Sequence, residues 1–155
     1  NNKRSKMALE ETIGKDLIQA MKAKDQATLR GIRAIKAAIL LAKTDGSGKE
    51  MTPEREIEML QKLVKQRRDS LAIFEEQNRE DLAVKEREEI EVIQQYLPAQ
   101  LTPEALEAEV GKIVAETGAS SMKDMGKVMG IASRQLAGRA EGKAISEVVK
   151  KLLSQ

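Results

Sequence analysis

The segment Tyr96-Leu97-Pro98-Ala99-Gln100-Leu101-Thr102-Pro103-Glu104 decides the fold, because it ends one helix and begins another. Pro98 stops the preceding helix, since proline disfavours the helical conformation in the residue before it. Thr102 at the cap, Pro103 at the first helical position and Glu104 in the first turn form a helix start. The segment therefore divides the chain into a larger N-terminal part and a C-terminal part of about 55 residues, a size at which an isolated core is marginal.

The N-terminal part has the apolar spacing of helices from end to end. A second helix start, Thr52-Pro53-Glu54, follows a stretch rich in turn formers. Near Asn78 the chain either begins another helix or bends the one before it. The pattern predicts about four helices over residues 7–97. The apolar residues that carry the first two helices are Leu9, Ile13, Leu17 and Met21, then Ile32, Ile35 and Ile39 after a boundary at Asp25.

The C-terminal part has the pattern of three shorter helices. They are expected from Pro103 to about Thr117, from Ser121 to about Leu136, and from Gly142 to about Leu153, with Gly118 and Gly138 as caps between them. We therefore predict an all-α protein, in which an N-terminal helical bundle of about four helices (7–97) precedes a C-terminal three-helix domain (98–155). Residues 1–6 are polar and basic, and we expect a disordered native extension or a remnant of an expression vector.

Composition limits the chemistry that the chain can perform. It has no His and no Cys, which excludes histidine acid/base catalysis, cysteine nucleophiles, disulfides and the usual zinc ligand sets. No nucleophile motif, phosphate loop or metal signature is present either. The sequence therefore predicts no catalytic residue, no metal and no cofactor. Because no apolar run approaches the roughly 20 residues that cross a bilayer, we expect a cytoplasmic protein without a membrane partner.

Charge is distributed unevenly along a chain whose net charge is only +2. From Ala119 to Gln155, seven basic residues stand against three acidic ones, whereas Glu75 to Glu91 holds eight acidic and three basic residues. This separation can steer an anionic partner towards the C-terminal helices. A second basic patch precedes the acidic tract, and an ordinary solvated helix face explains it better than a binding site does. It consists of Lys62, Lys65, Arg67 and Arg68.

Two glycines inside the helix predicted after Ser121 point to a binding surface. Glycine in a helix costs about 1 kcal/mol relative to alanine, so Gly126 and Gly130 indicate that another backbone approaches that face. A tight helix crossing within the chain would explain them without a ligand. Met122, Met125 and Met129 are expected to fill the core on the opposite face. The candidate contact residues for a nucleic acid are Lys123, Gly126, Lys127, Gly130, Arg134, Arg139 and Lys143.

Several stretches, in this order and spacing, resemble the GatB/YqeY family over nearly the whole chain from Met7 onward. One departure is Gly31, which lies where a bulkier or more varied residue is expected. Ser133-Arg134-Gln135 is a second departure, because the family resemblance suggests a more basic run at these positions. The stretches that carry the resemblance are 20–25 (AMKAKD), 29–36 (LRGIRAIK), 65–70 (KQRRDS), 81–83 (DLA), 96–98 (YLP) and the glycine segment within 121–143.

The resemblance implies a fold and a partner. Members of this family are similar to the tail module of the B subunit of an amidotransferase. That enzyme converts misacylated glutamyl-tRNA to glutaminyl-tRNA. Comparable modules are appended to some glutaminyl-tRNA synthetases. In those settings the module holds tRNA while other domains catalyse the reaction. By that resemblance, this chain would be a free-standing, non-catalytic tRNA-binding module that works with a tRNA synthetase or an amidotransferase complex.

The residues limit how such a module could contact RNA. Phe74 and Tyr96 are the chain's only aromatic residues, so it has no stacking platform for splayed bases. Contacts to phosphates and sugar edges remain, and these are shape-selective and salt-dependent. Two alternatives stay open at this stage. One is a protein interaction or oligomerisation module whose glycine face receives a partner helix, and the other is a carbon–nitrogen ligase activity that uses glutamine as amide donor.

Overall fold

The computed structural model describes residues 8–48 and 50–155, and it confirms the all-α class because no strand occurs among them. The expected tail at residues 1–6 lies outside the described residues. The helices are α1 (Leu9–Ala23), α2 (Gln26–Lys43), α3 (Pro53–Glu76), α4 (Glu80–Gln94), α5 (Pro103–Thr117), the short 3-10 helix η1 (Met122–Asp124), α6 (Met125–Gln135) and α7 (Gly142–Leu153).

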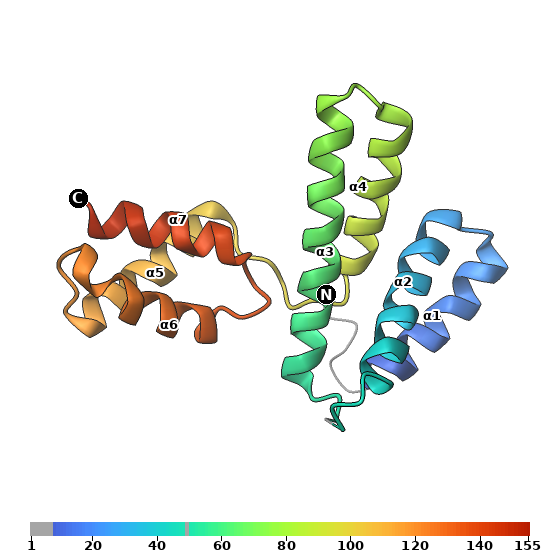
Figure 1. Cartoon of the computed structure of the whole chain (residues 1–155), viewed down its shortest axis with the longest axis horizontal. Helices are drawn as coiled ribbons and strands as arrows, with labels where there is room; N and C mark the ends of the chain where they lie inside the picture. The colour runs from blue at the N-terminus through green and yellow to red at the C-terminus, as the bar shows by residue number, and fades with distance from the viewer. Residues whose placement is uncertain (1–7, 49) are drawn as a thin grey trace. The chain divides into compact units, whose positions relative to one another are not determined.

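The chain divides into two compact units, the first ending at Pro98 and the second comprising Ala99–Gln155. In the first unit, α1 and α2 form one antiparallel hairpin and α3 and α4 form another (Figure 1). None of the helices in the described part of the chain is both long enough and apolar enough to cross a membrane.

Capping side chains begin three of the helices where the sequence predicts a start. The side chain of Thr52 accepts a hydrogen bond from the Arg55 N–H at 3.2 Å, and Thr102 caps α5 in the same way. Asp25 caps α2, because its carboxylate accepts the N–H and the hydroxyl of Thr28. These hydrogen bonds, that of the Thr28 hydroxyl above all, hold the pKa of Asp25 below its ordinary value.

Residues with positive φ reverse the chain between consecutive helices. Asn78 has φ 57°, so the chain ends α3 and begins α4 rather than bending one long helix. Lys24 has φ 56° between α1 and α2. Gly118 and Gly138 adopt φ 70° and 78°, the left-handed region that glycine occupies without steric cost. The two glycines therefore lie at turns, as the sequence predicts.

Tyr96 anchors the core of the first unit. Its side chain is 1% exposed, and its hydroxyl donates a hydrogen bond of 2.5 Å to the carboxylate of Asp16 on α1. Burial, and next the Asp16 carboxylate, raise the pKa of Tyr96 well above its ordinary value. The other buried residues of this core are Leu9, Ile13, Ile32, Ile35, Ile39, Leu60, Val64, Ile90, Val92, Ile93 and Leu97.

Gly31 allows α2 to pass close to α4. A Cβ atom built on Gly31 would lie 2.5 Å from Cγ1 of Val92 and 2.7 Å from its Cβ, closer than carbon atoms pack in proteins. The family resemblance suggests a bulkier or more varied residue at this position, but in this chain only a hydrogen atom fits between the two helices there.

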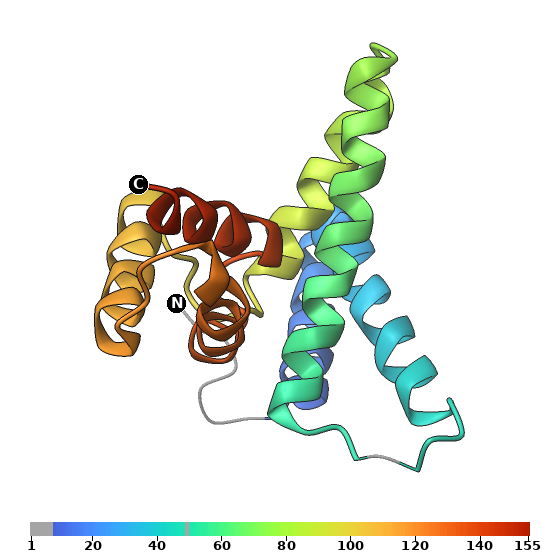
Figure 2. The same cartoon turned by 60° about the vertical axis from the view of Figure 1, so that its left-hand side comes forward.

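The second unit packs α5, α6 and α7 around a core of aliphatic side chains (Figure 2, yellow-orange to red). The loop between α6 and α7 is tied to the segment before α5. There the Leu101 N–H donates to the Arg139 carbonyl at 2.8 Å, and the Gln100 side chain donates to the Gly138 carbonyl at 2.6 Å. The buried residues are Leu106, Val110, Ile113, Val128, Ala132, Leu136, Ala140, Ile145, Val149 and Leu153.

The prediction that three methionines fill the core opposite the glycines of α6 is only partly correct. Met125 and Met129 are partly buried and pack against the core of the second unit. Met122 is 46% exposed, so its assignment to the core is wrong. It lies in the 3-10 turn η1, where the period of three residues per turn takes its side chain out of register with the buried face of α6.

Candidate nucleic-acid interface

One face of α6 carries most of the predicted contact residues. Lys127, Gly130 and Arg134 follow one another at i, i+3 and i+7, and all three are exposed. Val128 and Ala132 are fully buried on the opposite side. We call Gly126, Lys127, Gly130 and Arg134 the α6 stripe. Its two cations are about 10 Å apart along the axis, at the rise of an α-helix.

Both glycines of the α6 stripe face open space. A Cβ atom on Gly126 or Gly130 would meet nothing within 4 Å. A tight helix crossing inside the chain therefore does not explain these glycines, and no described segment supplies the approaching backbone that the sequence suggested. They lower helix stability without an intramolecular reason, which leaves the face open to another molecule.

The cations of the α6 stripe have no ion-pair partner in the described part of the chain. Among the residues that the structure describes, Lys127 and Arg134 form no salt bridge, and neither do Lys123 and Lys143. Lys151 of the same unit, by contrast, pairs with Glu107 at 3.2 Å. Unpaired cations keep their full charge available for an anionic ligand.

The remaining candidates lie on neighbouring elements rather than on the α6 stripe. Lys123 belongs to η1, one turn before Lys127. Arg139 lies half-buried in the loop between α6 and α7, and Lys143 lies in the first turn of α7. Sequence reasoning grouped all of these residues as one surface, and the structure brings Gly126, Lys127, Gly130 and Arg134 together on one helix face.

The second basic patch is largely engaged within the first unit. Arg67 pairs with Glu89 of α4 at 3.0 Å, and both side chains are less than a fifth exposed. Lys65 pairs with Asp69, one turn further along α3. Arg68 and Lys62 are exposed on the same helix. The patch therefore contributes a structural ion pair and a solvated helix face, in line with the alternative that the sequence left open.

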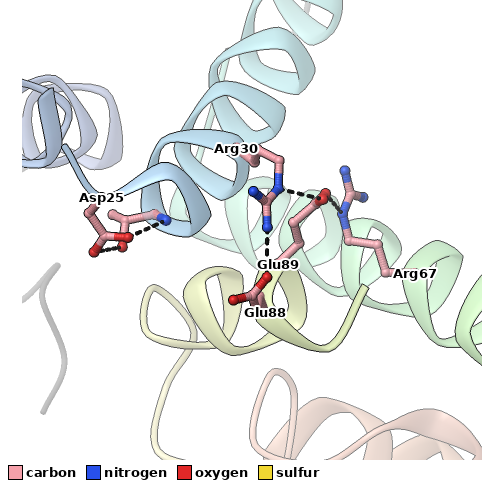
Figure 3. Close-up of polar contacts among 6 residues, drawn as sticks. Asp25, Arg30, Arg67, Glu88 and Glu89 are labelled. Atoms are coloured by element: carbon pink, nitrogen blue, oxygen red, sulfur yellow. Dashed lines mark hydrogen bonds and ion pairs between the residues drawn. The ribbon is translucent and has the colours of Figure 1, made fainter. Parts of the chain in front are cut away.

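A network of ion pairs that the sequence did not reveal joins three helices of the first unit (Figure 3). Arg30 of α2 donates to Glu88 at 2.8 Å and lies 3.4 Å from Glu89, which also binds Arg67 of α3. No local pattern could have paired these residues, because Arg30 and Glu88 are 58 positions apart and Arg67 and Glu89 are 22 positions apart. The network also neutralises part of the acidic tract, so that less negative charge faces solvent.

Glu86 lies beside this network in an electrostatically unfavourable position. One of its carboxylate oxygens is buried and accepts no hydrogen bond within the described part of the chain. Burial, and next the charge of Glu89, raise the pKa of Glu86, while Arg67 acts in the opposite direction. A carboxyl group with a raised pKa in the folded state favours folding most when it is protonated.

Replacing Glu86 by glutamine should therefore stabilise the protein at pH 7. The stability that wild-type Glu86 contributes is fully present below its unfolded pKa of 4.5 and is lost as the pH rises through the raised value. Urea denaturation should give Glu86→Gln a larger free energy of unfolding than the wild type at pH 7 and a similar one below pH 4.5. If the difference in free energy of unfolding between the variant and the wild type were the same at both pH values, the charge of Glu86 would not be its cause.

A metal centre is not formed by the carboxylates of this region. The described residues contain no group of three or more Asp, Glu, His or Cys side chains that could hold a metal ion.

Several curated proteins similar to this chain come from fungi and carry the name "Altered inheritance of mitochondria protein 41, mitochondrial". The protein from Lachancea thermotolerans is 41% identical over 96 residues, which cover 62% of this chain and 50% of the relative. The one from Vanderwaltozyma polyspora is 33% identical over 117 residues, which cover 72% of this chain and 63% of the relative. The one from Pyrenophora tritici-repentis is 32% identical over 143 residues, which cover 86% of this chain and 77% of the relative. The match thus spans about half the length of the Lachancea relative.

These names overturn the expectation of a cytoplasmic protein, because the relatives are described as mitochondrial. The absence of an apolar segment, on which that expectation rested, does not distinguish one aqueous compartment from another. The family resemblance itself is confirmed. The family model described as "Yqey-like protein" matches residues 10–153, which is nearly the whole chain. The chain therefore belongs to the Yqey-like protein family.

Proposed function

We propose that this chain is a non-catalytic accessory module that binds folded tRNA through the α6 stripe. The observation that carries the proposal is the open Gly130 on one exposed helix face, between Lys127 and Arg134, which pair with no acidic residue in 8–48 or 50–155. Two cations held on a rigid helix can bind two phosphates. A glycine between them lets the nucleic-acid backbone approach the helix axis more closely than any other residue would.

Composition of the second unit supports contacts to the RNA backbone rather than to bases. Residues 99–155 include no Phe, Tyr or Trp, so this unit has no side chain on which a splayed base could stack. Recognition by phosphate contacts depends on the shape of the RNA and weakens steeply with salt. A folded RNA whose outer surface presents closely spaced phosphates fits these properties.

The choice of tRNA rests on the family resemblance. The tail module that the family resembles holds tRNA for a catalytic partner, and we propose the same role here, with a tRNA synthetase or an amidotransferase complex as the larger assembly. No feature of the described residues favours the carbon–nitrogen ligase alternative, so we do not propose it.

Charge reversal in the α6 stripe should weaken tRNA binding. For the double variant Lys127→Glu/Arg134→Glu, we expect at least a tenfold loss of affinity at low salt, because a hydrogen bond to a charged group contributes about 1.5–3 kcal/mol. The dependence of affinity on salt should also become shallower, by about one unit of slope for each phosphate that the variant no longer binds. Gel-shift titration with unmodified tRNA at two salt concentrations measures both effects.

A control variant separates a local site from the overall charge. Lys65→Glu/Lys112→Glu changes the net charge equally, and both lysines are exposed and paired with acidic residues on their own helices. This variant should bind tRNA nearly as well as the wild type. Equal losses in the two double variants would contradict a site on α6.

A protein interaction or oligomerisation module is the second candidate, because the open glycine face of α6 could also receive a helix. It predicts that Gly126→Leu disrupts an assembly while salt has little effect. Light scattering of wild type and variant, at low and at physiological salt, distinguishes this candidate from tRNA binding.

A further inference from the structure

The outer side of α1 exposes two large apolar side chains in the first unit. Ile18 and Met21 are 55% and 56% exposed, while the opposite side of the same helix lies in the core. Gly14 stands one turn before Ile18, and a Cβ atom built on it would meet nothing within 4 Å. Open backbone therefore lies beside exposed apolar side chains, an arrangement that suits the close approach of another helix.

Charged residues continue this side of α1 in both directions. Glu11, Gly14, Ile18 and Lys22 follow at i, i+3, i+7 and i+11, which places them on one side of the helix. We call these four residues the α1 face. Glu11 and Lys22 are exposed, and neither forms an ion pair with any residue in 8–48 or 50–155. The α1 face is therefore acidic at its N-terminal end, apolar in the middle and basic at its C-terminal end.

This order of charges is complementary to itself when one helix is reversed. In an antiparallel pair of α1 helices related by a two-fold axis, Glu11 of each copy can lie level with Lys22 of the other. A parallel pair would instead set like charges against each other at both ends. In the antiparallel pair the two ion pairs are about 16.5 Å apart along the helix axis, at the rise of an α-helix.

The same register brings the apolar residues of one copy to the open glycine of the other. Ile18 then lies one residue, about 1.5 Å, from the level of Gly14 in the other copy, and Met21 lies two residues from that level. Because Gly14 has no side chain, both apolar side chains can pack against its backbone. Lys15 lies level with Ile18 of the other copy, where its aliphatic stem can cover Ile18 while its ammonium group stays in water.

We propose that two copies of this chain form a weak dimer by packing their α1 faces antiparallel. Figure 1 shows α1 on the side of α2 that is away from α3, where a second copy can reach it. The helix has 15 residues and is about 22 Å long. A contact between two helices of this length is at the small end of specific interfaces, below about 1,200 Å². The dimer is therefore expected to dissociate on dilution.

Other occupants fit the α1 face less well. An acidic helix or an anionic bilayer would meet Glu11 at one end of the face, and a basic segment would meet Lys22 at the other end. A helix that lies on a membrane also needs a long apolar stripe, and the large apolar residues exposed on α1 are Ile18 and Met21 alone. A second copy carries both charges in the reverse order, so it is complementary at both ends.

Sedimentation velocity of the full chain, over a concentration series that reaches the millimolar range, tests the dimer. The wild type should shift from monomer to dimer as the concentration rises. Ile18→Gln removes the apolar side chain and Gly14→Leu fills the space that it enters, so each variant should weaken the dimer about tenfold. Both positions are uncovered in the monomer, so the circular dichroism spectrum should stay that of the wild type.

Charge reversal tests the antiparallel register. Glu11→Lys and Lys22→Glu should each weaken the dimer about tenfold, because two like-charge contacts replace two ion pairs. The double variant Glu11→Lys/Lys22→Glu should restore the dimer. An equimolar mixture of the two single variants should restore it too, because opposite charges then face each other again. Lys112→Glu on α5 changes the net charge as Lys22→Glu does, and it should leave the dimer unchanged.

This dimer and the proposed tRNA site can be tested separately. The α1 variants should bind tRNA as the wild type does, and Gly126→Leu on α6 should leave the dimer intact. A wild type that stays monomeric throughout the series would overturn the proposal, and so would equal weakening by Lys22→Glu and Lys112→Glu. The same holds if the double variant fails to recover, or if Ile18→Gln loses binding to anionic phospholipid vesicles while its dimer is unchanged.

Discussion

Replacing Tyr96 by alanine is expected to lower the free energy of unfolding by about 3–5 kcal/mol, as for other large aromatic residues removed from a core. The ring is fully buried where α4 ends, and its hydroxyl binds Asp16 on the first helix. Removal creates a cavity and leaves the carboxylate of Asp16 without this donor. Because a domain of this size has a total stability of about 5–15 kcal/mol, the first unit should come close to unfolding. Urea denaturation followed by circular dichroism measures the change.

Tyr96→Phe separates packing from hydrogen bonding. It keeps the ring and removes the hydroxyl that donates to Asp16, so the expected loss is about 1.5–3 kcal/mol, the contribution of a hydrogen bond to a charged group. The alanine variant should therefore be clearly less stable than the phenylalanine variant. If the two variants lost the same stability, filling of the core by the ring would not be the reason for tyrosine at this position.

Replacing Gly31 by alanine should destabilise the protein, against the usual direction of this substitution in a helix. Alanine is favoured over glycine in a helix by about 1 kcal/mol. Here the added methyl group would lie 2.5 Å from Val92, so α2 and α4 would have to move apart. Overpacking of a core typically costs about 1–3 kcal/mol. Overpacking at the upper part of this range outweighs the gain in helix propensity, so we expect a net decrease of up to about 2 kcal/mol in the free energy of unfolding, measured by urea denaturation.

Gly14→Ala is the matched control for this prediction. Gly14 lies inside α1, and a Cβ atom there would meet nothing within 4 Å. The substitution should raise the free energy of unfolding by about 0.5–1 kcal/mol, since helical alanine loses less conformational entropy than glycine. The prediction is supported if the free energy of unfolding falls for Gly31→Ala and rises for Gly14→Ala. An increase at both would mean that α2 and α4 are not in close contact at Gly31.

Local signals explain why so much of the fold is readable from the sequence. Thr52, Thr102 and Asp25 begin helices through hydrogen bonds to residues three positions away, so a short stretch of sequence is enough to predict them. The exposure of Lys127 and Arg134 likewise follows from the helical period, because the apolar residues of α6 define the opposite face. The exposure of these two cations on one helix face was therefore predictable, whereas the sequence alone did not separate them from Lys123, Arg139 and Lys143.

Other features depend on partners that are distant in the chain. Tyr96 binds a residue 80 positions away, and Arg30 binds one 58 positions away. No periodicity indicates that Gly31 meets Val92, or that Glu89 lies between two arginines. The same limit explains why Met21, which follows the apolar period of α1, is 56% exposed. A helix pattern shows which residues share a face, but it does not show how much of that face a neighbouring helix covers.

The sequence by itself determined the helical class, the helix starts at Asp25, Thr52 and Thr102 and the identity of the cationic residues on α6, because capping and periodicity act over a few residues. Only the tertiary structure decided which charges are paired, which glycines are crowded and which apolar side chains remain in solvent. Gly31 and Gly130 both lie inside helices, yet one has Val92 against its backbone and the other has open space. The physical reason is that helix crossings bring together side chains that are far apart in sequence, and these contacts set both the burial and the free charge of every residue involved.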